Sequence, residues 1–204
     1  MMFLLVHLLI SLRGLRRIKW SQDLILTIFL ISKTMSKIRI VCPSCFPNQD
    51  WSKLEVLGSM LWLWHYDDMR QDATLPKIMG FLMPPIKLGQ FIAFYEADKP
   101  IGYISWANFN STVEDLYIQS HFNLLDDNQY WNCGDRTWII DYFAPFGHQK
   151  KILNLAKRLF PRAVVRSFAH KETQYKEKNV NLYRGVDVTR DEMNNWNKKH
   201  PLTT

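Results

Sequence analysis

The sequence predicts a single globular domain of the α+β class. Its 204 residues are 47% hydrophobic and 14% aromatic, enough for one full core but too few for two substantial domains. Two observations predict the class. Strand-like runs at 90–96 and 101–106 are separated by a turn, and amphipathic helical patterns at 51–64 and 149–160 flank them. We therefore expect helices and strands to share one core.

The first 34 residues are predicted to be an N-terminal extension outside the fold. Apolar runs at 1–12 and 24–31 flank a basic segment, and neither reaches the about 20 apolar residues that span a bilayer. Positive charge also follows the first run, unlike a secretory signal. A membrane-surface helix, a crude signal or anchor, and translation from an upstream start all stay open. Met35 resembles an ordinary cytosolic start, which favours the last and would leave 1–34 outside the native protein.

The formal charge of +7 is unevenly distributed along the chain. Residues 1–34 hold five basic residues against one acid, a net of +4, which leaves +3 for the remainder. No alternation of basic and aromatic residues follows one face of that remainder, so nucleic acid is not an expected partner. An acidic protein partner stays compatible with the mildly basic body.

Three cysteines, Cys42, Cys45 and Cys133, are too few for a disulfide framework and fit a reducing compartment. Cys42 and Cys45 have the C-x-x-C spacing of a zinc ribbon or a redox pair. No second pair follows to complete a four-ligand site, so no metal is predicted.

The first predicted elements are an irregular lead-in and a helix. Prolines break any periodicity in 36–50, so we expect folding to begin at Trp51. Apolar residues then recur at helical spacing as far as residue 64, and Ser52 with Glu55 has the form of a capping box. A polar cluster at 65–70 ends this helix.

A β-hairpin is the next predicted element. The apolar segment 75–85, which ends in two prolines, precedes it and is either a short helix or a loop over the core. The runs 90–96 and 101–106 then form the two strands, and the turn between them is Ala97-Asp98-Lys99-Pro100. A short helix around 113–122 follows.

The stretch 134–147 predicts a central strand that contains an acid. Gly134-Asp135 is a turn signal, 137–143 is rich in aromatic and β-branched residues, and Pro145 with Gly147 ends the run. Asp141 lies within the strand. Burying an unpaired carboxylate costs several kcal/mol, so we expect Asp141 to be paired, hydrogen-bonded or used in chemistry. A structural and a catalytic role both stay open.

The C-terminal third is predicted to add a basic helix and two strands. Residues 149–160 place apolar residues on one face and lysines and arginine on the other. That basic face is either solvated or part of an anion site at the helix N-terminus. Strands are expected at 162–169 and 181–188, and 191–204 is predicted to be a helix turn and polar tail. The domain would then span 51–190.

Three blocks, in order, resemble the RTX toxin-activating lysine acyltransferases, the hemolysin-activating family. The likeness covers roughly 51–165 and implies a GNAT-like fold, with a mainly antiparallel central sheet and flanking helices. The blocks are Leu54-Glu55-Val56-Leu57-Gly58 leading to Trp62-Leu63-Trp64, then Tyr103-Ile104-Ser105-Trp106-Ala107-Asn108, then Gly134-Asp135-Arg136-Thr137-Trp138 with Asp141-Tyr142-Phe143-Ala144-Pro145-Phe146-Gly147.

The resemblance implies a cytoplasmic bacterial enzyme that activates an RTX protoxin. Such an enzyme moves a fatty acyl chain from acyl carrier protein to the ε-amino group of internal lysines. Acyl-acyl carrier protein is thus the expected donor, with no bound cofactor, and the carrier and protoxin are the expected partners. A homodimer is allowed, and membrane contact is expected only if 1–34 belongs to the protein. The chemistry requires a base, oxyanion donors and an apolar groove.

The family's catalytic pair is an aspartate and a histidine, and this chain matches only the first. Asp141 matches the aspartate, whereas Arg70 stands at the histidine position and Asp67-Asp68-Met69 replaces the serine and proline before it. His65 lies five residues earlier, and it can act as the catalytic histidine only if the loop that follows takes a different path from the one in the family. A guanidinium stays protonated, so Arg70 cannot be the base. It is able to pair with Asp141 or to bind an acidic partner.

Trp106, Asn108 and Arg136, from the second and third blocks, are predicted to bind substrate. Two alternatives to an active enzyme stay open. One is a catalytically degenerate relative that binds the carrier or the toxin without turnover. The other is a membrane-anchored accessory protein that uses residues 1–34.

Overall fold

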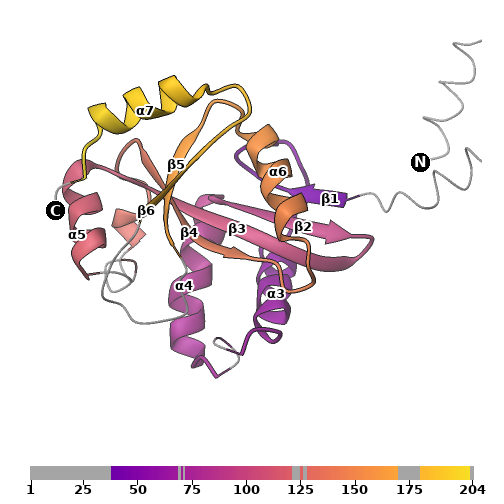
Figure 1. Cartoon of the computed structure of the whole chain (residues 1–204). Coiled ribbons are helices and arrows are strands. Elements are labelled where there is room, and N and C mark those ends of the chain that lie inside the picture. The colour runs from indigo at the N-terminus through magenta and orange to yellow at the C-terminus, as the bar shows by residue number, and fades with distance from the viewer. Residues whose placement is uncertain are drawn as a thin grey trace, which may run out of the picture. The chain divides into compact units, whose positions relative to one another are not determined.

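A six-stranded sheet with the strand order β1-β2-β3-β4-β5-β6 forms the centre of the domain (Figure 1). All neighbouring strands are antiparallel except β4 and β5, which run parallel. This confirms the predicted α+β fold with a mainly antiparallel sheet. The strands are β1 (Ile38–Val41), β2 (Phe91–Glu96), β3 (Lys99–Phe109), β4 (Arg136–Phe143), β5 (Val164–Phe168) and β6 (Val180–Arg184).

The structure, a computed structural model, describes residues 38–68, 70, 72–120, 125, 128–169 and 180–202. The predictions for 1–34 lie outside these residues. The described helices are α3 (Lys53–Trp64), α4 (Leu75–Leu88), α5 (Ser111–Ser120), the 3-10 turn η2 (Asn128–Tyr130), α6 (Gln149–Leu159) and α7 (Arg190–Lys199).

The helices cover both faces of the sheet. Helices α3 and α4 lie below it in Figure 1, where Met60 and Leu82 pack against Phe91 and Tyr103. Helix α6 covers the other face, where Ile152 joins a separate core cluster. A third cluster forms around Trp131 and Trp138 beside α5. The sheet separates the cluster under α6 from the core packed on α3 and α4, so each functional side chain belongs to one side.

Most predicted elements are present, with shifted ends. Ser52 caps α3 by accepting the Glu55 N–H at 3.4 Å, as the capping-box pattern predicts. The helical alternative for 75–85 is correct, and the helix continues to Leu88, where Gly89 adopts φ +69°. Glycine suits this left-handed C-cap because it has no Cβ to clash.

Three local predictions need correction. The hairpin turn is only Ala97-Asp98, because Glu96 pairs directly with Lys99. The segment expected to be an irregular lead-in contains β1, which pairs with β2. The expected helix turn after residue 190 is a ten-residue helix, α7, begun by a capping box between Thr189 and Glu192.

A bulge between β3 and β4 decides which face Asp141 points to. Ser105 lies opposite Asp141, but Trp106 lies opposite Ile139, so Ile140 is an extra residue in β4. In a regular strand, Trp138 and Asp141 would point to opposite faces because they are three residues apart. The bulge turns Asp141 to the α3 face of the sheet.

Candidate active site

The Asp141 carboxylate is the centre of a buried hydrogen-bond network. Its side chain is 2% exposed, and its Oδ1 accepts a hydrogen bond from Arg70 Nη2 at 2.7 Å. Its Oδ2 accepts one from the Tyr103 hydroxyl, which itself accepts one from the Trp64 indole. The network joins α3, β3, β4 and the loop after α3, and it contains the Arg70–Asp141 pair that the sequence allowed. We call Trp64, Asp67, Arg70, Tyr103 and Asp141 the carboxylate cluster.

Arg70 connects this cluster to solvent. Its side chain is 22% exposed, pairs also with Asp67, and lies 4.6 Å over the Phe143 ring. Burial disfavours the charged guanidinium, but the carboxylate charges of Asp141 and Asp67 outweigh burial and raise the pKa of Arg70. Arg70 therefore remains a cation and cannot accept a proton from a lysine.

Tyr103 acts on Asp141 as a neutral donor. Its side chain is fully buried, and burial first, then the nearby charge of Asp141, hold the pKa of Tyr103 well above its ordinary value. The phenol thus keeps its proton at any physiological pH. Both carboxylate oxygens of Asp141 consequently have a donor, one charged and one neutral.

His65 occupies a different position from Arg70. It is the exposed C-cap of α3, and its ring meets Tyr66 edge-on at 5.4 Å. The described contacts therefore place a guanidinium, not this imidazole, on Asp141.

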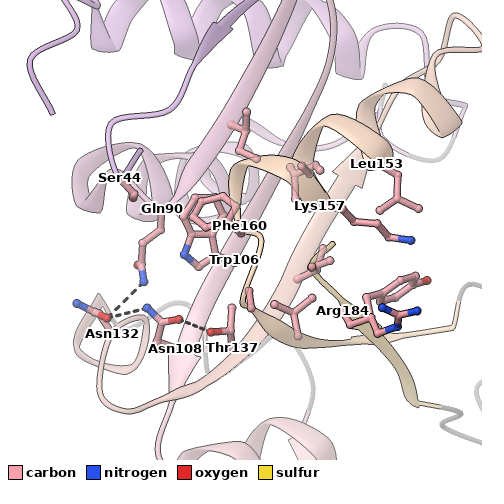
Figure 2. A pocket seen from close by; sticks show the side chains of 18 of the residues that line it. Ser44, Gln90, Trp106, Asn108, Asn132, Thr137, Leu153, Lys157, Phe160 and Arg184 are labelled. Atoms are coloured by element: carbon pink, nitrogen blue, oxygen red, sulfur yellow. Dashed lines mark hydrogen bonds between the residues drawn. The ribbon is translucent and has the colours of Figure 1, made fainter. Parts of the chain in front are cut away.

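A cavity of about 420 Å³ lies on the α6 face of the sheet (Figure 2). Its walls are mainly apolar, and Trp106 and Asn108 are both among its lining residues. Asn108 donates to Asn132 at 3.0 Å and accepts from the Thr137 hydroxyl at 2.9 Å, which forms a polar end. Lys157 lies at the other end in Figure 2, together with Arg184. The cavity and the carboxylate cluster are on opposite faces of the sheet.

Arg136 lies away from both features. It pairs with Glu114, a fully buried acid on α5, which also accepts hydrogen bonds from the Trp138 indole at 2.7 Å and from Arg166 at 2.5 Å. Arg166 in turn donates to Asn197 of α7 at 2.9 Å. We call Glu114, Arg136, Trp138 and Arg166 the Glu114 cluster. The three predicted substrate-binding residues are therefore split between a cavity and a buried ion cluster.

Neither a metal cluster nor a membrane span is found in the described part of the chain. No three His, Cys, Asp or Glu side chains gather there as a cation would require, and no described helix is long and apolar enough to cross a bilayer. Cys42 and Cys45 are free thiols. Burial, together with the adjacent Cys45, raises the pKa of the Cys42 thiol to about 12, so Cys42 stays protonated.

The mixed sheet, its flanking helices and the buried acid on β4 are consistent with a GNAT-like α+β domain. Within that class, the family model described as the RTX toxin acyltransferase family matches residues 49–184, well over half of the chain. The chain belongs to this family. The resemblance seen in the three sequence blocks is thereby confirmed.

Individual relatives agree with the family match. The chain is 33% identical to the leukotoxin-activating lysine-acyltransferase LtxC of Aggregatibacter actinomycetemcomitans over 57% of this chain and 68% of the relative. It is 31% identical to the protein-lysine palmitoyltransferase CyaC of Bordetella bronchiseptica over 71% of this chain and 70% of the relative. It is 33% identical to the RTX-II toxin-activating lysine-acyltransferase ApxIIC of Actinobacillus pleuropneumoniae over 55% of this chain and 69% of the relative.

Proposed function

We propose that this protein transfers a fatty acyl chain from acyl carrier protein to lysines of an RTX protoxin and thereby activates the toxin. The observation that carries the proposal is the family match together with Asp141, which is buried on β4 and held by two donors. The names of the relatives, which are lysine acyltransferases and a lysine palmitoyltransferase, support lysine as the acceptor. The proposal places the protein in the cytoplasm, where its free cysteines stay reduced.

The proposed reaction exchanges a thioester for an amide. The ε-ammonium group first loses a proton, and the amine nitrogen then bonds to the thioester carbonyl carbon. The carbon–sulfur bond then breaks, the nitrogen gives up its second proton to become an amide, and the carrier thiolate takes up a proton as it leaves. Charge develops on the carbonyl oxygen during this step, so a fixed donor near it lowers the barrier.

Arg70 is the donor that we assign to that oxygen. Asp141 and Asp67 both pair with the guanidinium, and the side chain of Arg70 is 22% exposed to solvent. A guanidinium held in this way keeps its charge and its direction during the reaction. Asp141 is then the residue that orients Arg70, and His65, at the exposed end of α3, is the candidate base.

The cavity under α6 is the site that we assign to the acyl chain. Its apolar walls suit an aliphatic chain, with Trp106 along the wall and Asn108 at the polar end. The proposal requires the acyl thioester to pass from one face of the sheet to the other, and we place this passage along β4, beyond the end of β5. Trp138 pairs with Arg166, but β5 ends two residues later at Phe168, one residue short of the level of Asp141. Among the described residues, β4 thus has no β5 partner beside Asp141.

The test is acyl transfer by the full chain. Radiolabelled acyl-acyl carrier protein and an RTX protoxin are incubated with the wild type, and label is expected on protoxin lysines. Asp98→Ala, in the exposed hairpin turn, is a matched control that should transfer as the wild type does. Failure of the wild type to transfer label would overturn the proposal.

A second function is favoured by one observation: Arg70, which stands where the resemblance expects a histidine, occupies Asp141 Oδ1. The chain would then bind carrier protein or toxin without turnover. Binding by the wild type, no transfer, and a gain of transfer in Arg70→His would select this function. Transfer by the wild type and its loss in Arg70→His would select the enzyme.

A further inference from the structure

We propose that Trp62, Tyr66 and Phe146, the aromatic triad, bind the ε-ammonium group of the acceptor lysine, and that Lys99 of the chain itself occupies this place in the free protein. The identity of the acceptor rests on the proposed function. The existence of a lysine-binding surface rests only on the contacts described next.

The three rings form one continuous aromatic surface. The ring centroids are 4.8 Å apart for Trp62 and Tyr66, 5.0 Å for Tyr66 and Phe146, and 5.5 Å for Trp62 and Phe146. Tyr66 is 48% exposed, and the other two rings are half-buried. Each ring contacts both others, and the half-exposed Tyr66 opens the triad to solvent.

A lysine ammonium already sits on the triad. Lys99 Nζ lies 4.1 Å from the ring centroid of Phe146 and 5.5 Å from that of Trp62, within the about 6 Å over which a ring attracts a cation. Lys99 is exposed and belongs to the start of β3. A cation–π contact at an exposed site is weak, so an incoming lysine is able to displace it.

The triad and the carboxylate cluster share one hydrophobic core cluster. Trp62 and Phe146 pack on the same core cluster that contains Trp64 and Tyr103. Trp62 and Tyr66 flank Trp64 in the chain, two residues away on each side. Phe146 lies three residues beyond Phe143, the ring that Arg70 covers. One core cluster therefore links the triad to the network built on Asp141.

The local charge also favours a cation over an anion. Asp67 and Asp141 provide two carboxylates against the one guanidinium of Arg70, which leaves the cluster with net negative charge. Aromatic faces and net negative charge both attract an ammonium. The acceptor lysine would thus arrive on the α3 face, opposite the cavity assigned to the acyl chain.

The test compares two probes with the full chain: Nα-acetyl-lysine methylamide and its neutral analogue Nα-acetyl-norleucine methylamide. Binding is measured by ligand-detected NMR titration. Lys99→Ala is expected to bind the lysine probe about threefold more tightly than the wild type, because one competing cation is removed. Binding of the norleucine probe should not change. Lys77→Ala, which removes an exposed lysine of α4, is the matched control and should leave both affinities unchanged.

Ring removal completes the test. Phe146→Leu in the Lys99→Ala background should abolish the threefold gain. Tyr66→Leu, at the most exposed ring, should weaken binding without unfolding the chain, which a thermal melt checks. Equal affinity for both probes, or no gain in Lys99→Ala, would overturn the inference. Binding requires no acyl donor, so a chain that prefers lysine but fails to transfer acyl groups contradicts the proposed function and leaves this inference intact.

Discussion

Asp141 and Glu114 are both buried carboxylates paired with arginine, yet their surroundings differ. Glu114 is fully buried and has two arginines, Arg136 and Arg166, of which the latter is 1% exposed and bonds to α7. Asp141 has one arginine, which reaches solvent, and one neutral phenol. Residue type is therefore a poor guide to function here. Near-complete burial is what a structural ion cluster requires, whereas access to solvent through Arg70 is the reason we propose the carboxylate cluster as the reactive one.

Glu114→Gln is expected to have the largest effect on stability. It leaves two guanidiniums without their shared counter-charge, one of them fully enclosed, at a cost of about 3–5 kcal/mol in the free energy of unfolding. Urea denaturation measures this loss. Asp98→Asn, in the exposed hairpin turn, is the control and should stay within about 0.5 kcal/mol of the wild type. A Glu114→Gln protein as stable as the control would erase the distinction between the two clusters.

Asp141→Asn should affect transfer more than folding. The amide retains the size of the carboxylate but removes the charge that holds Arg70, so we expect a loss of about 100-fold in the rate of acyl transfer. The free energy of unfolding should fall by about 1–3 kcal/mol, less than in Glu114→Gln. Radiolabel transfer and urea denaturation are measured on the same preparation. Full activity in Asp141→Asn would show that acyl transfer does not require the ion pair between Arg70 and Asp141.

Alkaline pH should weaken the carboxylate cluster through Tyr103. Because burial raises its pKa in the folded chain, the unfolded chain releases this proton first, from about pH 10 upward. The contribution of Tyr103 to the free energy of unfolding is therefore fully present below about pH 10 and is lost as the pH rises toward its raised folded-state pKa. The pKa values of Tyr95, Tyr117 and Tyr142 are also raised in the folded chain. Each of these tyrosines therefore adds its own loss of stability to the wild type at alkaline pH.

Tyr103→Phe isolates the contribution of this one phenol. Thermal melts at pH 9 and pH 11 should show a smaller alkaline loss in the variant, by about 1 kcal/mol, than in the wild type. The same loss in both proteins would mean that Tyr103 ionises as readily when folded as when unfolded.

His65→Ala is expected to have the smallest effect. The side chain is exposed, so stability should change by less than about 0.5 kcal/mol. As a candidate base open to solvent it can be replaced in part by buffer, so transfer should fall by less than about tenfold and recover when imidazole is added. A larger loss without rescue would assign His65 a fixed place in the site.

Local patterns predicted the elements better than the site. Helical spacing predicted α3 with its Ser52 cap, and the aromatic run predicted β4 with Asp141 inside it. Glu114 was missed because its partners lie 22 and 52 residues away and nothing in its own helix marks it. In the sequence it is an ordinary acid in the first turn of α5, where acids are common.

The sequence by itself determined the family, the α+β class and an acid within an apolar strand, because each depends on residues that are close in the chain. Only the tertiary structure decided where that acid points and what it meets. The extra residue in β4 turns Asp141 toward α3, and Arg70 reaches it from 71 residues away. Strand alternation is a local property, but a bulge and a long-range ion pair depend on register and packing across the whole sheet.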